Sequence, residues 1–339
     1  MQAVKVLSAN VGWQQPRKIY SSVTDSDATM TGSMTGSEHA VRPFGAQRWT
    51  LALATLALFA ACARESPETE EVPAVPETVS SSDGVPISYE VQGTGPVALV
   101  FIHGWSCDRS YWEAQLEPFS RDFQVVAVDL AGHGESGLGR EAWTIESFGG
   151  DAAAVVGELG LERVILIGHS MGGDVIMEAA RRLPGRVEGL VWVDTYRQLG
   201  TPRTAEQVQA MMAPFRADFE ETTRTFVRGM FPPGAEESLV ERVAADMSAA
   251  PPEVALGALE SAITYDREVT VALGEMDLPA VAINPDNLPT DIESMERYGV
   301  DVVLMPGVGH FLMMEDPEGF NPLLRKAIEE LLRSVDAAE

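Results

Sequence analysis

The chain has little cysteine and little lysine, and it has no apolar run long enough to cross a bilayer. With two cysteines in 339 residues, Cys62 and Cys107, we expect no intrachain disulfide. The most apolar stretch, residues 49–62, falls short of the roughly 20 residues that a membrane-spanning helix needs. No group of His, Cys and Asp residues has the spacing of a metal site, so we expect no metal or other cofactor.

Positive charge is also scarce. From Cys62 onward the chain carries 19 basic and 48 acidic side chains, and Lys326 is the only lysine among them. A surface with this excess of negative charge repels phosphate backbones, which excludes nucleic acid as an expected partner.

The apolar stretch at residues 49–62 has the pattern of a secretory signal. Arg42 and Arg48 precede it, and small residues close it. Its end, Phe59-Ala60-Ala61-Cys62, resembles the lipobox of bacterial lipoproteins, in which the cysteine carries the lipid. The alternative is ordinary cleavage after Ala63, which would release a soluble secreted protein. Because such a signal normally lies near the start of translation, we expect the true start at Met30 or Met34.

Residues 1–61 are therefore interpreted as a targeting segment, and residues 62–78 as a disordered tether. The tether is acidic and rich in proline, and it cannot bury enough apolar surface to fold. We expect an exported protein, anchored by lipid at Cys62 to a bacterial membrane and facing the periplasm or the exterior. Several acyl chains would make such an anchor stable.

Beyond residue 79, apolar runs alternate with helix-like segments, which is typical of a parallel sheet covered on both faces. The expected strands are 97–102, 124–128, 163–167, 189–193, 280–283 and 301–305, after a hairpin at 79–91. The expected helices are 111–118, 145–159, 174–182, 292–298 and 317–334. Residues 196–270 differ from this alternation, because they have a helical pattern rich in Met and Phe. An insertion of this kind usually covers a pocket. Most of its Met and Phe side chains should form the core of the insertion, and a minority should line the pocket.

The pentapeptide Gly168-His169-Ser170-Met171-Gly172 lies between an expected strand and an expected helix. Glycines around a serine at such a junction allow a tight, strained turn that exposes the hydroxyl at the helix N-terminus. In isolation the motif is weak, because a serine before a helix is often only an N-cap. Its position after a buried strand makes Ser170 the candidate nucleophile.

Acyl transfer by a serine also needs donors for the oxyanion and a general base. A developing oxyanion needs two preorganised N–H donors, and the backbone amides of Trp105 and Met171 are the expected pair. His310, on a glycine-flanked loop after a strand, is the expected general base. His103 is expected to order the loop before Trp105, and no acid–base role is needed for His133.

A carboxylate should fix the imidazole of His310. Asp286, which follows strand 280–283, gives the order Ser170, Asp286, His310 and is the preferred candidate. Asp194, at the end of the preceding strand, is the alternative. Asp291 and Glu293 are poorer candidates because they begin a helix.

Four motifs together resemble the α/β-hydrolase superfamily in its capped, serine-nucleophile branch: His103-Gly104-Trp105, the loop at residues 129–136, the Ser170 pentapeptide with Gly173, and Gly307-Val308-Gly309-His310-Phe311. The resemblance implies an α/β fold with a mostly parallel eight-stranded sheet flanked by helices. The core would comprise residues 79–195 and 271–339, with a helical cap, residues 196–270, inserted after strand six. The loop at residues 129–136 is expected to have a structural role.

The resemblance also implies cofactor-free hydrolysis of a small-molecule carboxylic ester or lactone by a serine esterase. The same triad can serve a perhydrolase, a thioesterase or an amidase, because pocket shape selects the substrate. The fold can also serve as a non-catalytic binding module, although degenerate members usually lose the serine or the histidine. The natural substrate and the oligomeric state are not specified by the sequence.

Overall fold

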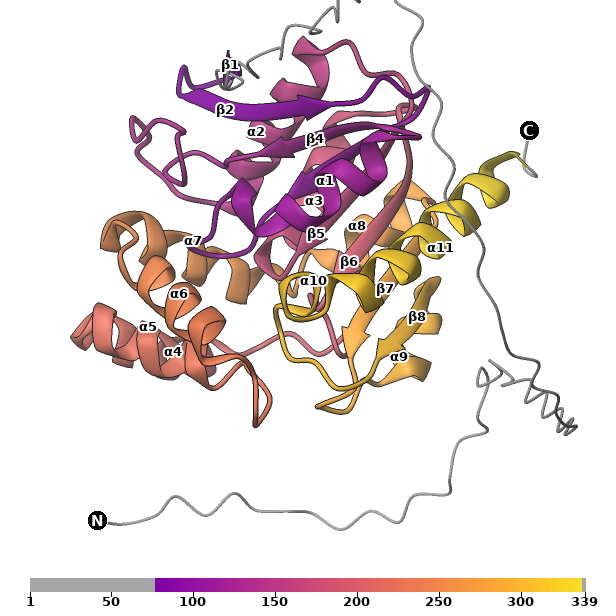
Figure 1. Cartoon of the computed structure of the whole chain (residues 1–339). Coiled ribbons are helices and arrows are strands. Elements are labelled where there is room, and N and C mark those ends of the chain that lie inside the picture. The colour runs from indigo at the N-terminus through magenta and orange to yellow at the C-terminus, as the bar shows by residue number, and fades with distance from the viewer. Residues whose placement is uncertain (1–76, 337–339) are drawn as a thin grey trace, which may run out of the picture. The chain divides into compact units, whose positions relative to one another are not determined.

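The computed structural model describes residues 77–336 (Figure 1). The expected targeting segment, Cys62 and all but the last two residues of the expected tether lie outside the described residues. Those last two residues belong to the first strand, because Glu77 and Thr78 pair with β2.

Eight strands form one sheet in the order β1-β2-β4-β3-β5-β6-β7-β8. β2 runs antiparallel to both of its neighbours, β1 and β4, and all other neighbouring strands pair in parallel. The predicted eight-stranded, mostly parallel sheet is therefore confirmed. The strands are β1 Glu77–Ser80, β2 Pro86–Gln92, β3 Ala98–Ile102, β4 Gln124–Val128, β5 Val164–His169, β6 Val187–Val193, β7 Ala280–Pro285 and β8 Val300–Met305.

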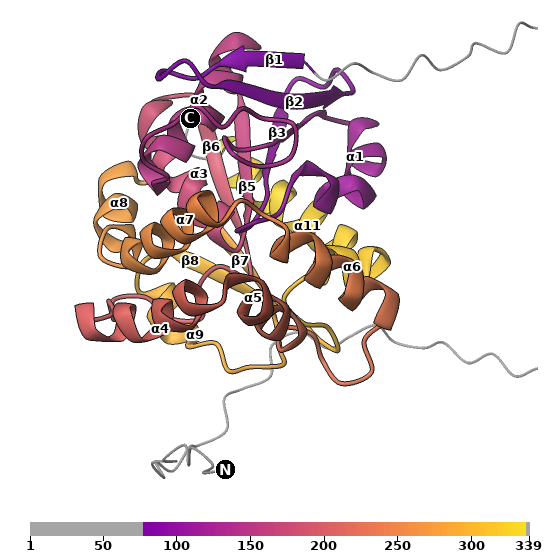
Figure 2. The same cartoon turned by 90° about the vertical axis from the view of Figure 1, so that its left-hand side faces the viewer.

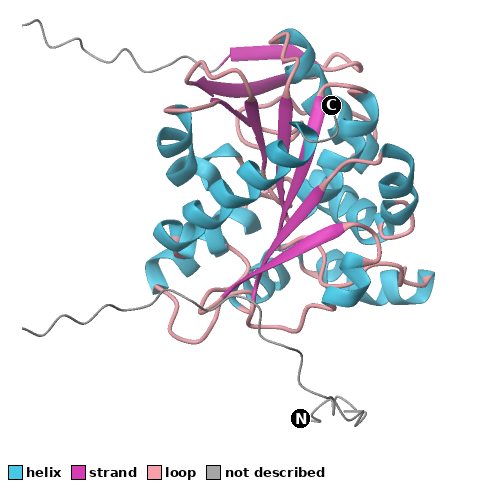
Figure 3. Ribbon diagram, turned by 90° about the vertical axis from the view of Figure 1, so that its right-hand side faces the viewer, coloured by secondary structure: helices cyan, strands magenta, loops and turns pink. Residues whose placement is uncertain are grey.

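Helices cover both faces of this sheet (Figures 2 and 3). On one face α3 lies between α2 and α8, and on the other α1 contacts α11. These helices are α1 Glu113–Ser120, α2 Ile145–Glu158, α3 Met171–Arg182, α8 Val269–Met276 and α11 Pro317–Asp336. Three short helices complete the layers: η1 Arg109–Trp112, α9 Ile292–Glu296 and α10 Leu312–Glu315.

Four further helices lie between β6 and α8 in the sequence, and we call them the helical insertion. They are α4 Ala205–Ala217, α5 Phe219–Arg228, α6 Glu237–Ser248 and α7 Pro252–Tyr265, and they group on one side of the sheet (Figure 1). The next helix, α8, packs against α3 in the layer that flanks the sheet. The four helices of the insertion thus lie within residues 205–265.

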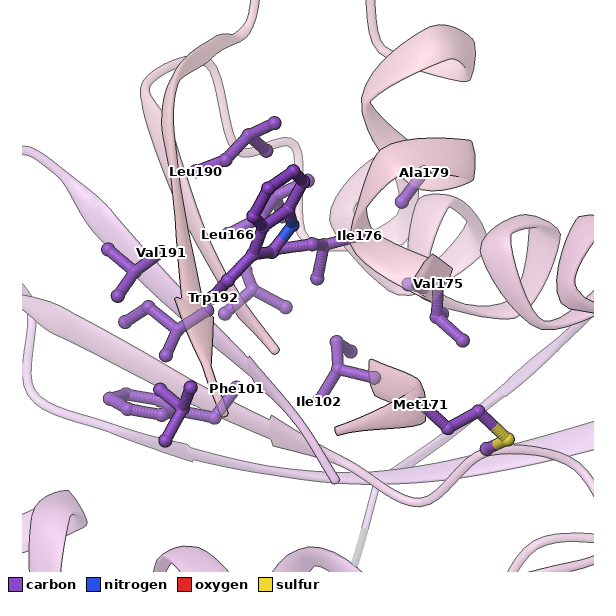
Figure 4. Close-up of a cluster of buried hydrophobic side chains, with 14 of the residues drawn as sticks. Phe101, Ile102, Leu166, Met171, Val175, Ile176, Ala179, Leu190, Val191 and Trp192 are labelled. Carbon is purple, nitrogen blue, oxygen red and sulfur yellow. The ribbon is translucent and has the colours of Figure 1, made fainter. Parts of the chain in front are cut away.

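The core that positions the site lies between the sheet and α3 (Figure 4). Ile102 of β3, Leu166 of β5 and Trp192 of β6 lie beside Ile176 of α3, and all four side chains are fully buried. Each such residue contributes about 1.5–3 kcal/mol by burial, which holds α3 firmly against the strand ends. The first turn of α3, which follows Ser170, is fixed by this packing.

Candidate active site

Ser170 occupies a strained turn between β5 and α3. Its φ of 52° and ψ of −121° lie in a region that residues with a side chain seldom adopt. The turn is fixed by Ser170 N–H, which donates to Val193 O at 2.9 Å, and by Ser170 O, which accepts from Gly173 N at 2.9 Å. Thr195 Oγ1 also donates to Ser170 O at 3.0 Å. The structure thus confirms the predicted elbow.

Glycines flank the serine because the backbone passes too closely for any side chain. A Cβ at Gly168 would lie 2.2 Å from Gly172 O, and one at Gly172 would lie 2.5 Å from Ile102 O. A Cβ at Gly104 would lie 3.3 Å from the Cβ of Ser170. The turn that carries Trp105 therefore packs directly against the serine elbow.

His310 lies on the loop after β8, and its backbone is held on both sides. Its N–H donates to Met230 O at 3.1 Å, and its carbonyl accepts from His169 Nε2 at 2.9 Å. Glu315 accepts from Gly309 N at 2.9 Å and from Phe311 N at 3.1 Å. Burial raises the pKa of Glu315, and these two hydrogen bonds oppose that shift. Glu315 thus fixes the loop, a role that the sequence analysis missed.

The carboxylate on His310 is Asp194, and the preferred pairing with Asp286 is wrong. Nδ1 of His310 lies 2.7 Å from Oδ2 of Asp194, and because a carboxylate only accepts, Nδ1 donates this hydrogen bond. Asp194 follows β6, is buried and has a φ of 45°. The alternative considered from the sequence is therefore the residue that contacts the imidazole.

Asp286 is exposed and turned elsewhere because β7 runs two residues further than predicted, to Pro285. Its amide continues the pairing with β8 by donating to Met305 O at 3.0 Å. Its Oδ1 accepts from Gly307 N at 3.4 Å. Asp291 caps α9 by accepting from Ser294 N at 3.0 Å, as expected of a residue that begins a helix.

Asp194 has a second partner that the sequence analysis did not identify. Arg197 lies 3.0 Å from Oδ1 of Asp194, the oxygen that His310 leaves free. The only signal of this contact available in the sequence is the position of Arg197, a cation three residues after Asp194 and just beyond the end of a buried strand.

The two predicted oxyanion donors lie at the same cavity as Ser170 and His310. In the part of the chain that the structure describes, the amides of Trp105 and Met171 donate to no backbone carbonyl. The Trp105 side chain is fixed by a 2.7 Å hydrogen bond from Nε1 to Ala255 O of α7. Its ring also meets Phe215 of α4 edge-on, at a centroid distance of 5.5 Å.

Two buried histidines order the loops beneath the site, as predicted for His103. His103 Nε2 accepts from Leu130 N at 3.1 Å, and His103 Nδ1 donates to Gly104 O at 2.8 Å. His133 Nδ1 donates to Ala131 O at 3.0 Å. Burial lowers the pKa of His103 to about 4 and that of His133 to about 3, so both rings are neutral at pH 7.

The loop at residues 129–136 is held by the buried carboxylate of Asp129. This group accepts from the amides of Arg109 at 2.7 Å and Glu135 at 2.9 Å. A Cβ at Gly134, where φ is 50°, would lie 2.3 Å from the same carboxylate. These contacts support the structural role expected for the loop.

A cavity of about 1250 Å³ contains the candidate residues Ser170, Asp194, His310, Trp105 and Met171. Much of its apolar wall comes from the helical insertion: Met211, Phe215, Phe226, Met247, Leu259 and Ile263. As expected, some Met and Phe residues of the insertion line the pocket while others, such as Met212, are buried in its core.

The cavity also has polar lining residues, among them a buried carboxyl, Asp174, one helical turn beyond Ser170. The hydroxyl of Tyr196 donates to Asp174, and Arg203 pairs with Asp266 close by. Burial raises the pKa of Asp174 well above its usual range, and the hydrogen bond from Tyr196 partly opposes that shift. The cavity lining thus combines apolar side chains with buried polar groups.

Within residues 77–336 no cluster of three or more His, Cys, Asp or Glu side chains could hold a metal ion. Among the same residues, no helix combines the length and apolar character that crossing a membrane would require.

The chain is similar to known proteins in both sequence and structure. This chain is 38% identical over 117 residues to a non-heme haloperoxidase of Rhodococcus erythropolis, a match that covers 34% of this chain and 42% of the relative. It is 35% identical over 108 residues to a bifunctional esterase/perhydrolase of Acinetobacter calcoaceticus, covering 31% and 39% respectively. The chain thus spans about two fifths of the length of these curated relatives.

A solved structure matches over more of the chain. A thermophilic esterase from Thermogutta terrifontis is 27% identical, has a TM-score of 0.64, and is matched over 99% of its length by 76% of this chain. The model of the "Alpha/beta hydrolase family" matches residues 99–323, well over half of the sequence. Together with the sheet order and the serine elbow, this match shows that the chain belongs to the alpha/beta hydrolase family.

Proposed function

We propose that this protein is a serine hydrolase that cleaves carboxylic esters or lactones through an acyl-enzyme. The observation that carries the proposal is the 2.7 Å hydrogen bond between His310 and the buried Asp194, in a cavity that is also lined by Ser170 on its strained elbow. This is the arrangement by which an imidazole is kept in the tautomer that can accept a serine proton.

In the proposed reaction, Nε2 of His310 removes the proton of Ser170 Oγ as the oxygen attacks the substrate carbonyl. The amides of Trp105 and Met171 hold the oxyanion, each worth about 3 kcal/mol in the transition state. His310 then gives its proton to the leaving alkoxide. A water molecule, deprotonated by His310, cleaves the acyl-enzyme and restores the serine.

The size of the cavity supports a substrate with sizeable groups. Its volume of about 1250 Å³ exceeds the roughly 300–1,000 Å³ of most small-molecule sites. Thioether and aromatic side chains from the helical insertion adapt to acyl chains of different shape. We further propose that the insertion is a cap over the nucleophile.

Covalent labelling tests the nucleophile directly. A fluorophosphonate probe should modify the protein once, and peptide mapping should place the label on Ser170. Ser170→Ala should abolish labelling and lower the turnover of a soluble ester by a factor on the order of a million. As a control, circular dichroism should show that the variant is folded. A folded wild-type protein that takes up no label would contradict the proposal and favour a non-catalytic binding module.

A second candidate reaction is perhydrolysis, favoured by the similarity to a haloperoxidase and to an esterase/perhydrolase. Here hydrogen peroxide replaces water, attacks the same acyl-enzyme and releases a peracid while Ser170 regains its proton. Peracid formation from a short-chain ester and hydrogen peroxide measures this activity. A rate well below that of hydrolysis at equal acceptor concentration would exclude it as the main reaction.

We also propose export and lipid anchoring at Cys62. The support is the apolar segment before Cys62 and the acidic tether after it. Intact mass of the mature protein should show an acylated Cys62, and Cys62→Ser should move the protein from the detergent phase to the aqueous phase. A wild-type protein without lipid would instead favour the soluble secreted form.

A further inference from the structure

Both oxygens of the Asp194 carboxylate are bound, and they face different positively polarised groups. Oδ2 accepts from Nδ1 of His310 at 2.7 Å, and Oδ1 lies 3.0 Å from the guanidinium of Arg197. Only 5% of the Asp194 side chain is exposed, so water competes little with either partner. The orientation of the acid is therefore determined by His310 and Arg197 together.

The guanidinium is itself anchored to the loop after β7. One of its nitrogens donates to Leu288 O at 2.7 Å and to Pro285 O at 3.2 Å, and the other donates to Asn287 Oδ1 at 3.2 Å. The backbone of Arg197 is also tied down, because its carbonyl accepts from Asp291 N at 2.7 Å. Both terminal nitrogens are engaged, so Arg197 is poorly placed to bind an anionic substrate although it lines the cavity.

We propose that Arg197 is a positioning residue of the reaction, which orients Asp194 and limits how strongly that carboxylate favours the protonated form of His310. This inference rests on the proposed function. The positioning role follows from the planar guanidinium of arginine, whose N–H groups can bridge a carboxylate and two carbonyls at fixed angles. Lysine cannot do this.

The two effects act on different measurable quantities. Correct orientation of Asp194 increases the rate of proton transfer through His310, which appears in kcat. The positive charge of Arg197 beside Oδ1 offsets the attraction between Asp194 and an imidazolium formed during the reaction, so removing that charge should change the pH dependence of kcat/KM. Two other ionisable groups lie close to Asp194 and His310. One is Glu315, which holds the His310 loop, and the other is His169, whose ring centroid lies 4.6 Å from that of His310.

The test compares Arg197→Gln with Arg197→Lys, using kcat, KM and the pH dependence of kcat/KM on a soluble uncharged ester. In Arg197→Gln, kcat should fall by about 10- to 100-fold with little change in KM, as expected when a catalytic group is misplaced. The acid limb of the profile should also move to higher pH. Arg197→Lys keeps the charge and loses the planar guanidinium, so its acid limb should stay near that of the wild type while kcat still falls.

Arg297→Gln is the matched control, because it removes one positive charge from an exposed position at the end of α9. It should leave kcat and the acid limb unchanged. If Arg197→Gln does not fold, Asn287→Leu removes a single anchor of the guanidinium and should lower kcat by a smaller factor.

Wild-type kcat with an unmoved acid limb in Arg197→Gln would overturn the inference. A loss confined to KM would also overturn it, because it would make Arg197 a substrate ligand. Failure of the proposed function gives a different result, because the wild-type protein would then take up no fluorophosphonate. If the wild-type protein is labelled and Arg197→Gln has unaffected kinetics, this inference alone is rejected.

Discussion

At the scale of a single residue, the hydrogen bond from Nδ1 of His310 to Asp194 determines which imidazole tautomer is favoured. Asp194→Asn keeps the shape of the side chain but can turn an N–H toward the imidazole, which favours the wrong tautomer. We expect kcat to fall by about 10⁴-fold with KM little changed. Asp286→Asn, its matched control, should stay within about twofold of the wild type. Steady-state kinetics in which Asp286→Asn is the more damaging variant would restore the sequence-based choice.

The placement of Ser170 and His310 at one cavity could be predicted from the sequence, whereas the carboxylate that contacts the imidazole could not. A glycine-flanked serine after a buried strand is a local pattern, and so is a histidine between glycine and phenylalanine at the end of another strand. The choice between Asp194 and Asp286 depends on two tertiary details. These are the extension of β7 to Pro285 and the positive φ of Asp194, neither of which has a local sequence signal.

At the scale of an element, the first turn of α3 packs closely against the end of β3, near the proposed oxyanion donors Trp105 and Met171. A Cβ at Gly172 would lie 2.5 Å from Ile102 O and 2.6 Å from His103 O, so Gly172→Ala must push the helix away from the strand. We expect a loss of about 1–3 kcal/mol in the free energy of unfolding. Because the amides of Trp105 and Met171 also separate, kcat should fall by about tenfold or more.

Gly274→Ala is the control for that variant, because no atom lies within 4 Å of a Cβ at this position in α8. Removing a glycine from a helix interior should stabilise the protein by about 0.5–1 kcal/mol without a change in kcat. Urea unfolding followed by circular dichroism measures both variants. Equal stability of the two would contradict the packing described for α3.

Most elements could be predicted from the sequence because buried strands are continuous apolar runs. The strand at 124–128 has the predicted bounds, and the C-terminal helix begins at Pro317 as expected. The helix at 174–182 was predicted three residues too short at its start, since Met171-Gly172-Gly173 has weak helix propensity and is held helical by packing against β3.

At the scale of the whole molecule, three buried neutral histidines should make the fold sensitive to acid. Burial lowers the pKa of His103 to about 4, that of His133 to about 3, and that of His169 well below 6.5. The unfolded chain binds these protons below pH 6.5 while the folded chain does not. Their contribution to stability is therefore present above pH 6.5 and is lost progressively as the pH falls toward 4.

We expect the urea midpoint of wild-type protein to be lower at pH 5.0 than at pH 7.5. His133→Gln removes one of the three groups and keeps a side chain able to donate to Ala131 O, so its midpoint should change less between the two pH values. An identical pH dependence in the variant would show that His133 is not among the groups that take up protons on unfolding.

Asp194 and Arg197, which contact each other, both precede the helical insertion in the chain, since α4 begins only at Ala205. Any exchange of this insertion between relatives, in evolution or in the laboratory, therefore has a natural splice point after Arg197. A chimera joined before Asp194 would import a foreign acid with no matching partner on the loop after β7. A chimera joined after Arg197 would keep Asp194 together with its arginine partner, but the donor insertion would have to supply carbonyls in place of Met230 O and Ala255 O, which hold His310 and Trp105.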